Sequence, residues 1–125
     1  MKLTKAKDWV LGIATVTAIV GVGITTASYT AHPTEHVVRI TAKRFEYHPA
    51  SVTVKRGEPV VIELRSLDRL HGFIQPQLGI RADVLPGQTA RVRFVPKQSG
   101  LFPFHCDIFC GTGHEGMTGE IRVVD

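Results

Sequence analysis

The sequence has few of the features that indicate nucleic-acid binding or acid–base catalysis. No basic run with interleaved aromatic residues occurs in its 125 residues, and the formal net charge of +4 includes three lysines close to the N-terminus. Nucleic acid is therefore not an expected partner. Neither a nucleophile–base pair nor a pair of carboxylates suited to acid–base chemistry stands out, so we do not expect an enzyme from this chain alone.

Tryptophan and cysteine are scarce. Trp9 is the one tryptophan, aromatic residues make up 7% of the chain, and two cysteines occur. Both cysteines fall in the last fifth of the sequence. The apolar fraction of 43% can still supply a packed core. Internal repeats and low-complexity tracts are absent, and the length suits one domain of ordinary size.

Formal charge is missing from residues 9–34. The apolar stretch 10–27, as a helix, would be about 27 Å long, close to the ~30 Å hydrocarbon core of a bilayer. We predict an N-terminal membrane anchor over residues 1–31, with the preceding lysines in the cytoplasm. The alternative is a signal peptide cleaved near residues 25–27. Either way the remainder is exported, to the periplasmic or extracytoplasmic side.

After a short linker at residues 32–35, the pattern is typical of β-strands. Val38, Ile40 and Ala42 alternate with polar residues, which is the period of a half-buried strand. Further short strands are expected at residues 51–54, 59–65, 72–75, 80–84, 90–95, 101–105 and 119–124. Seven or eight short strands without a convincing helix predict an all-β antiparallel sandwich over residues 36–125.

The last predicted loop holds a cluster of soft metal ligands. Cys106, Cys110, His114 and Met117 follow one another with the spacing Cys-x3-Cys-x3-His-x2-Met. Thiolate and thioether ligands select copper over magnesium, calcium or manganese. A pair of thiolates can share its charge between two metal ions, which points to a two-copper centre.

Three plainer readings compete with that centre. A cysteine pair in an exported protein is most often a disulfide. Both cysteines with two histidines could also hold one tetrahedral zinc, although zinc has no use for Met117. A mononuclear blue-copper site needs one cysteine and leaves the second unexplained. Two bridged copper ions use every residue of the cluster.

An additional histidine ligand is expected from upstream. His71 lies at a junction between two predicted strands, which suits a ligand reaching in from a separate loop. His105 is adjacent to Cys106, and strand alternation points it away from the ligand face. The remaining histidines are placed in the linker region or a turn: His32, His36 and His48. We expect none of these four to bind the metal.

At these residues the chain resembles the cupredoxins that carry the binuclear CuA centre, in cytochrome c oxidase subunit II and nitrous oxide reductase. The resemblance covers roughly residues 36–125 and includes Asp68, three residues before His71. It implies a cupredoxin-like Greek-key fold in which Cys106 and Cys110 bridge two coppers. His71 and Met117 would complete one copper. His114 and the main-chain carbonyl of Ile108 would complete the other.

The chain also departs from subunit II. That family usually has a glutamate where Ile108 stands here, serving a magnesium site, and a tryptophan-bearing patch that receives electrons from cytochrome c. The resemblance implies a membrane-anchored electron-transfer protein whose partners are a c-type cytochrome or a terminal reductase or oxidase. The alternative is an exported copper-binding or copper-delivery protein that holds Cu(I) with the same ligands.

Two groups near the centre have open roles. Asp68 could stabilise the His71 loop, or it could be a surface carboxylate paired with Arg69 or another arginine. Phe73, Phe104 and Phe109 are expected either to wall the centre with apolar surface or to be ordinary core residues.

Overall fold

The computed structural model describes Gly21, Gly23, Ala27, Ser28 and residues 30–125. Most of the predicted membrane anchor, including its stretch 10–20, lies outside the described residues. Among the residues that are described, no helix is long and apolar enough to cross a membrane. Residues 31–125 form a compact unit of their own.

This unit is an all-β sandwich, as the alternating sequence pattern predicts. Its strands are β1 (His36–Lys43), β2 (Glu46–His48), β3 (Ser51–Lys55), β4 (Val60–Ser66), β5 (His71–Gln75), β6 (Ile80–Val84), β7 (Thr89–Phe94), β8 (Gly100–His105) and β9 (Thr118–Val124). Two short 3-10 turns, η1 (Pro76–Leu78) and η2 (His114–Gly116), complete the elements. The three-residue strand β2 was not expected, because it is too short to show a period.

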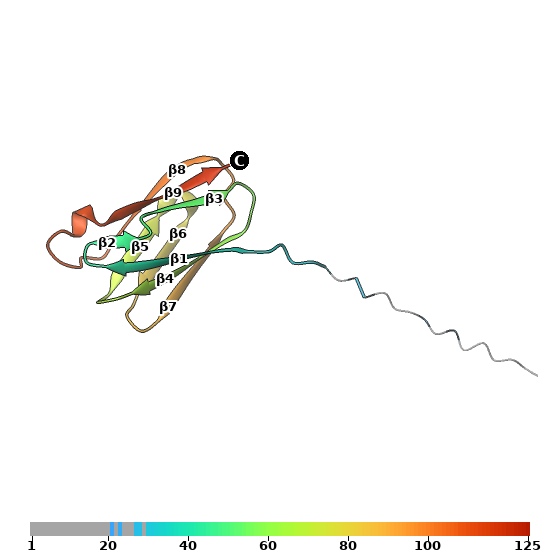
Figure 1. The fold of residues 1–125 in the computed structure, drawn as a ribbon, viewed down its shortest axis with the longest axis horizontal. Coiled ribbons are helices and arrows are strands. Elements are labelled where there is room, and N and C mark those ends of the chain that lie inside the picture. Colours follow the sequence, from blue (N-terminus) through green and yellow to red (C-terminus); the bar gives the residue numbers. More distant parts are fainter. Residues whose placement is uncertain (1–20, 22, 24–26, 29) are drawn as a thin grey trace, which may run out of the picture. The chain divides into compact units, whose positions relative to one another are not determined.

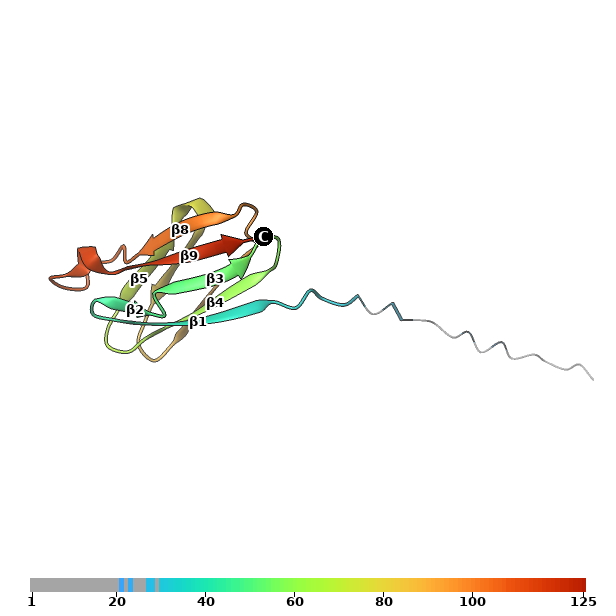
Figure 2. The ribbon, with the colours of Figure 1, turned by 45° about the horizontal axis from the view of Figure 1, so that its top comes forward.

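Two sheets face each other (Figures 1 and 2). One has the strand order β2-β1-β4-β7 and the other β3-β9-β8-β5-β6. The predicted antiparallel pairing holds for β1–β2, β4–β7, β5–β6, β5–β8 and β8–β9. It is wrong for two pairs, because β1 pairs with β4 in parallel, and so does β3 with β9. These partners are joined by long connections that pass through the other sheet, and not by hairpins. Side-chain periodicity reports which face is buried but carries no information on strand direction.

The core lies between the sheets and continues up to the end that carries η2. Ile40, Ile62 and Leu64 from one sheet are at most 1% exposed. Tyr47 packs edge-on against Phe73 and Phe104, with ring centroids 5.9 and 5.0 Å away. Edge-to-face contacts of this kind add to the stabilisation from burial alone. We call Tyr47, Phe73 and Phe104 the aromatic floor; all three are at most 2% exposed.

Three connections meet at one end of the sandwich: β1–β2, β4–β5 and β8–β9. In Figures 1 and 2 the β8–β9 connection with η2 lies at the end opposite the C-terminus. The sandwich therefore brings together segments that are up to about seventy residues apart, and holds them on rigid strands, which is how such folds position functional loops.

Candidate metal centre

The segment 106–117, which we call the cysteine loop, is closed at its base and turned at its tip. The Cys106 amide donates to the Met117 carbonyl across 3.2 Å, and the Met117 amide donates to the His114 carbonyl across 3.1 Å. Gly113 has a φ of 109°, and a Cβ there would lie 2.9 Å from the Phe45 ring. Only glycine combines that backbone conformation with so close an approach.

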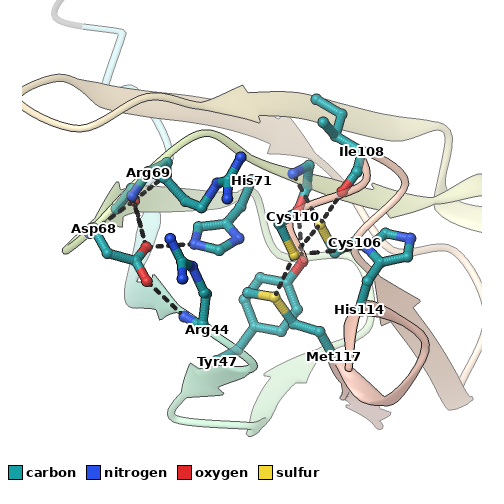
Figure 3. Close-up of polar contacts among 12 residues, drawn as sticks. Arg44, Tyr47, Asp68, Arg69, His71, Cys106, Ile108, Cys110, His114 and Met117 are labelled. Atoms are coloured by element: carbon teal, nitrogen blue, oxygen red, sulfur yellow. Dashed lines mark hydrogen bonds and ion pairs between the residues drawn. The ribbon is translucent and has the colours of Figure 1, made fainter. Parts of the chain in front are cut away.

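The loop gathers its sulfur and nitrogen donors in one buried spot. Cys106 and Cys110 are free thiols whose sulfurs lie 3.9 Å apart. The Cys110 sulfur is also 3.9 Å from Met117 Sδ and 3.6 Å from His114 Nδ1 (Figure 3). A disulfide needs sulfurs about 2 Å apart, so the two cysteines in this arrangement are not a disulfide.

His71 joins this cluster from the first position of β5. Its side chain is fully buried, and ligand atoms of His71, Cys106 and Cys110 all lie within 4.8 Å of one another. His71 Nε2 is 2.6 Å from Asp68 Oδ1, whereas the buried Nδ1 has no hydrogen-bond partner in the described structure. A buried polar nitrogen without a partner is costly, and a metal ion among the thiols would compensate it.

Asp68 determines which nitrogen of His71 is available. Partial burial by itself would raise the pKa of Asp68, but hydrogen bonds from the Arg44 amide, His71 and the Arg69 amide outweigh it and lower the pKa to about 2. The ionised carboxylate accepts a hydrogen bond from Nε2–H, so the neutral imidazole keeps its lone pair on Nδ1. Metal-binding histidines are commonly oriented in this way. Asp68 contacts the Arg69 main chain at 2.7 Å and forms no ion pair with the Arg69 side chain.

Tyr47 and Gly72 connect the aromatic floor to the thiols. The Tyr47 hydroxyl donates to the Gly72 carbonyl across 2.5 Å, and the Gly72 amide donates to Cys106 Sγ across 3.2 Å. Burial, reinforced by the neighbouring Cys106, raises the pKa of Tyr47, so the phenol remains a hydrogen-bond donor. An amide that points at a thiolate stabilises its negative charge.

Without a metal, the surroundings of Cys110 favour its neutral thiol. Burial raises the pKa of the Cys110 thiol, and the adjacent Cys106 raises it further. A free thiolate is therefore disfavoured here. Metal ligation requires deprotonated thiols, so binding of a cation would release protons. The positive charge of the cation would then stabilise the thiolates.

Ile108 presents its main chain to the cluster and not its side chain. The Ile108 carbonyl oxygen is 3.1 Å from Cys106 Sγ, and Figure 3 shows its side chain pointing away. The expected carbonyl donor is thus next to the sulfurs. Together with the sulfurs and both imidazoles, the structure brings all six predicted site residues to one place: His71, Cys106, Ile108, Cys110, His114 and Met117.

The four excluded histidines are exposed: His32, His36, His48 and His105. Of the three phenylalanines expected at the wall, Phe73 and Phe104 are completely buried. Phe109 is 70% exposed and packs against His114 at a centroid distance of 5.9 Å, so it is neither wall nor core. The tight turn of the cysteine loop points Phe109 outward while it points Cys110 inward.

Sequence reasoning missed Tyr47, Arg81 and Asp107. Asp107 is hydrogen-bonded to Arg81 and packs against Gly72, where a Cβ would lie 1.9 Å from Asp107 Oδ1. The position of Asp107 between the two cysteines was a signal that it borders the centre. Tyr47 and Arg81 come from other strands and carry no local signal.

Comparison with known proteins agrees with this geometry. Residues 15–122 match a family profile described as a cupredoxin-like domain. Cytochrome c oxidase subunit 2 of Thermus thermophilus is 35% identical over 91 residues, which cover 73% of this chain and 67% of that protein. Nitrous-oxide reductase of Stutzerimonas stutzeri is 32% identical over 75 residues, which cover 57% of this chain and 12% of the reductase.

Solved structures show the same fold. The periplasmic domain of subunit II of cytochrome oxidase from Bradyrhizobium japonicum superposes with a TM-score of 0.67 at 21% identity, covering 72% of this chain and 84% of that one. The metal-binding domain of a Cu(I)-exporting P-type ATPase from Streptococcus pneumoniae gives a TM-score of 0.60 at 20% identity, covering 76% of this chain and all of that one.

Proposed function

Because the chain belongs to the cupredoxin-like family, we propose that its residues 36–125 hold two copper ions in a CuA centre. The protein would then act as a membrane-anchored electron-transfer protein similar to cytochrome c oxidase subunit II. The observation that carries the proposal is the buried, unpartnered Nδ1 of His71 beside two free cysteines whose sulfurs are 3.9 Å apart. A single zinc or blue-copper site would leave part of this donor set unused.

Each donor has a role in this proposal. Cys106 and Cys110 would bridge both ions, His71 and Met117 would complete one, and His114 with the Ile108 carbonyl the other. Such a pair of copper ions, when bound, supplies a one-electron redox couple shared between two metals. Electron transfer is fast when the geometry of the donors barely changes between the two redox states. The residues around the centre would contribute by holding the donors in place.

The chain's own groups supply that rigidity. Asp68 keeps a proton on Nε2 of His71 and so keeps Nδ1 available as a ligand. The Gly72 amide stabilises charge on the Cys106 sulfur. The buried aromatic floor and the fully buried Met117 exclude water from the sulfurs. Water exclusion and hydrogen bonds to the sulfur are the means by which a protein tunes the potential of a copper site.

Location and partners form the rest of the proposal. The uncharged stretch at residues 10–27 supports a single-pass anchor with the sandwich on the extracytoplasmic side. The relatives named cytochrome c oxidase subunit 2 support a c-type cytochrome or a terminal oxidase as redox partner. Ile108 lacks the carboxylate that a neighbouring magnesium site would need, so no such site is included.

Copper loading of the full chain tests this function. We expect two copper ions per chain and a coloured centre whose EPR spectrum reports one unpaired electron shared by both ions. One metal per chain, or preference for zinc, would contradict the proposal. A colourless product that exchanges Cu(I) readily with a chelator would instead favour the copper-delivery alternative.

A further inference from the structure

The outer face of the sheet β2-β1-β4-β7 carries neighbouring arginines, far from the ligands of the metal centre in the strand order. The strand register places Arg39, Glu63 and Arg91 side by side on β1, β4 and β7. Arg65 on β4 and Arg93 on β7 lie in the rows on either side of this one. All of these positions alternate with the buried core positions of their strands, so the side chains lie on the solvent face. We call this surface the arginine face.

The carboxylate in the middle row is shared and covered. Glu63 lies 3.9 Å from the Arg39 guanidinium and 3.6 Å from that of Arg91. The Glu63 side chain is 18% exposed, whereas those of Arg39 and Arg91 are 78% and 50% exposed. One carboxylate neutralises one of the two guanidinium groups at most. The row therefore presents positive charge to solvent above a largely covered negative one.

The other two arginines add a further excess of positive charge. Arg93 lies 3.5 Å from Glu35, which compensates it. Arg65 donates from Nε to the Thr89 hydroxyl across 2.9 Å, and it makes no ion pair with any residue that the structure describes. The arginine face thus combines four arginines with two glutamates, an excess of two positive charges.

This excess equals the net charge of the whole sandwich. From residue 32 onward the sequence has 12 lysines and arginines and 10 aspartates and glutamates. Charges elsewhere are balanced, as in the pairs Lys43–Glu46 at 2.9 Å and Arg122–Glu120 at 3.6 Å. The outer face of the other sheet, which carries Arg122, points to the opposite side of the molecule (Figures 1 and 2). The sandwich is therefore polar in charge, with one positive flat side.

A hollow in the arginine face suits a phosphate group. Its volume is about 290 Å³, and Arg39 and Arg65 line it together with Thr41 and Glu63. Guanidinium groups bind phosphate with two parallel hydrogen bonds and are more weakly hydrated than ammonium groups. The same residues would be less suited to an apolar ligand, because charged groups dominate the lining.

We propose that the arginine face binds anionic phospholipid headgroups, so that the sandwich lies against the membrane that holds the proposed anchor. Basic groups near an anionic bilayer are attracted to it individually, and the effect falls off within a Debye length. A second copy of the face would carry the same charge and be repelled. This inference rests on the membrane anchoring in the proposed function and specifies which side of the domain meets the lipid.

The short linker makes a weak attraction sufficient. Residues 28–35 connect the uncharged stretch to β1 and can span at most about 27 Å, at ~3.4 Å per residue. A tethered domain meets the headgroups at a high effective concentration, so the excess of two charges need not support binding from free solution. Glu35, the last residue of the linker, contacts Arg93, so the tether enters the domain beside the arginine face.

Arginine modification in lipid nanodiscs tests the proposal residue by residue. We would insert the full chain into nanodiscs of phosphatidylcholine alone, or of phosphatidylcholine with an equal part of phosphatidylglycerol. The ionic strength would be about 0.01 M, where the Debye length is about 30 Å. Phenylglyoxal modifies accessible guanidinium groups, and mass spectrometry gives the rate at each arginine.

The expected result is protection of one face only. In the anionic nanodiscs, Arg39, Arg65 and Arg91 should react roughly three-fold more slowly, or slower still, than in the neutral ones. Arg122, on the opposite face, should react at rates that agree within about 1.5-fold between the two nanodiscs. The protection should vanish at about 1 M salt, where the Debye length is about 3 Å.

Double variants separate the position of the charge from its amount. Arg39→Gln/Arg65→Gln should abolish the protection of Arg91, and Arg39→Lys/Arg65→Lys, which keeps the charges, should retain it. Lys55→Gln/Arg122→Gln removes the same charge from the exposed face of the other sheet and should also leave Arg91 protected. Thermal unfolding verifies that the variants are folded.

Three results would overturn the inference. One is an equal rate at Arg39, Arg65 and Arg91 in both nanodiscs, and another is equal slowing at Arg122. The third is protection of Arg91 by added polyglutamate in neutral nanodiscs without protection by phosphatidylglycerol, which would indicate the carboxylates of an acidic protein as the occupant.

Failure of the proposed function can be distinguished from failure of this inference. The copper spectrum reports on the electron-transfer centre, and insertion into nanodiscs reports on the anchor. If the chain does not insert, co-sedimentation with vesicles of the same two compositions, at about 0.01 M ionic strength, decides the lipid inference alone. Binding to anionic vesicles that Arg39→Gln/Arg65→Gln removes and Lys55→Gln/Arg122→Gln retains would support it, and absence of binding by the wild type would refute it.

Discussion

Arg81 and Asp107 form a two-point ion pair that joins strand β6 to the cysteine loop. Arg81 Nε is 2.8 Å from Asp107 Oδ2, and a second guanidinium nitrogen is 3.3 Å from Oδ1. Asp107 stands between Cys106 and Ile108, and its carboxylate packs against the backbone of Gly72. The Asp107 side chain thus connects the cysteine loop with β6 through Arg81, and with β5, which carries His71, through Gly72.

We expect Arg81→Gln to speed the release of copper roughly ten-fold, because outer contacts of this kind typically change metal affinity by about 10–100-fold. Arg81→Lys should rescue only partly, since lysine keeps the charge but not the fork. Copper transfer to an excess of chelator measures the release rate. Arg122→Gln, which breaks an ion pair with Glu120 on β9, is the matched control. Equal release rates for the two glutamine variants would contradict a positioning role for Arg81.

The sulfur ligands should rank in a defined order. Cys106→Ser and Cys110→Ser should each abolish the two-copper spectrum, because each sulfur is proposed to bridge both ions. Met117→Leu should retain the centre and shift its potential, because a weak thioether ligand tunes the metal more than it holds it. Optical spectra and redox titration compare the three. Damage by Met117→Leu equal to that of either serine variant would show that the roles are wrongly assigned.

Histidine substitutions distinguish His71, the proposed ligand from a separate loop, from His105, which we expect not to bind the metal. His71→Ala should remove the centre or weaken its metal binding strongly, whereas His105→Ala should have little effect, because His105 is exposed and His71 is buried beside both thiols. Ile108→Ala should also be mild, since the proposed donor there is the main chain. Metal affinity and spectra of the three variants decide. A centre that survives His71→Ala but not His105→Ala would refute the assignment.

Asp68 should make the stability of the metal-free protein depend on acid pH. Its pKa in the folded chain is lowered to about 2 from a reference value of 3.8. A lowered folded pKa means that the ionised carboxylate stabilises the fold above about pH 4, and that this stabilisation is lost as the pH falls toward 2. We expect a contribution of roughly 1 kcal/mol, since solvent screens part of the interaction.

Denaturant unfolding of the wild type and Asp68→Asn between pH 2 and pH 6 measures this contribution. The free energies of unfolding should differ at pH 6 and converge near pH 2. A difference that does not change with pH would mean that Asp68 acts through its shape or its neutral hydrogen bonds. In the copper-loaded chain, Asp68→Asn should also shift the redox potential, because the amide is a weaker acceptor for the His71 proton.

Much of the centre could be predicted from the sequence because its donors are nearly contiguous. Cys106, Cys110, His114 and Met117 fall within twelve residues, so their spacing already limits which metal can satisfy them all. His71 followed from its place at a strand junction and from the poor placement of the other histidines. Alternation of apolar and polar residues was equally sufficient for the sandwich, because burial on one face of a strand is a local property.

The tertiary structure decided what depends on packing between distant segments. Strand direction in the β1–β4 and β3–β9 pairs follows from the paths of the connections, which side-chain periodicity does not record. The free nitrogen of His71 is Nδ1 because Asp68, positioned by the amide of Arg44, binds Nε2. Phe109 is exposed because the cysteine loop turns tightly enough to direct its side chain outward while Cys110 points inward. Each outcome depends on which atoms from remote parts of the chain reach the same place, and no local pattern contains that information.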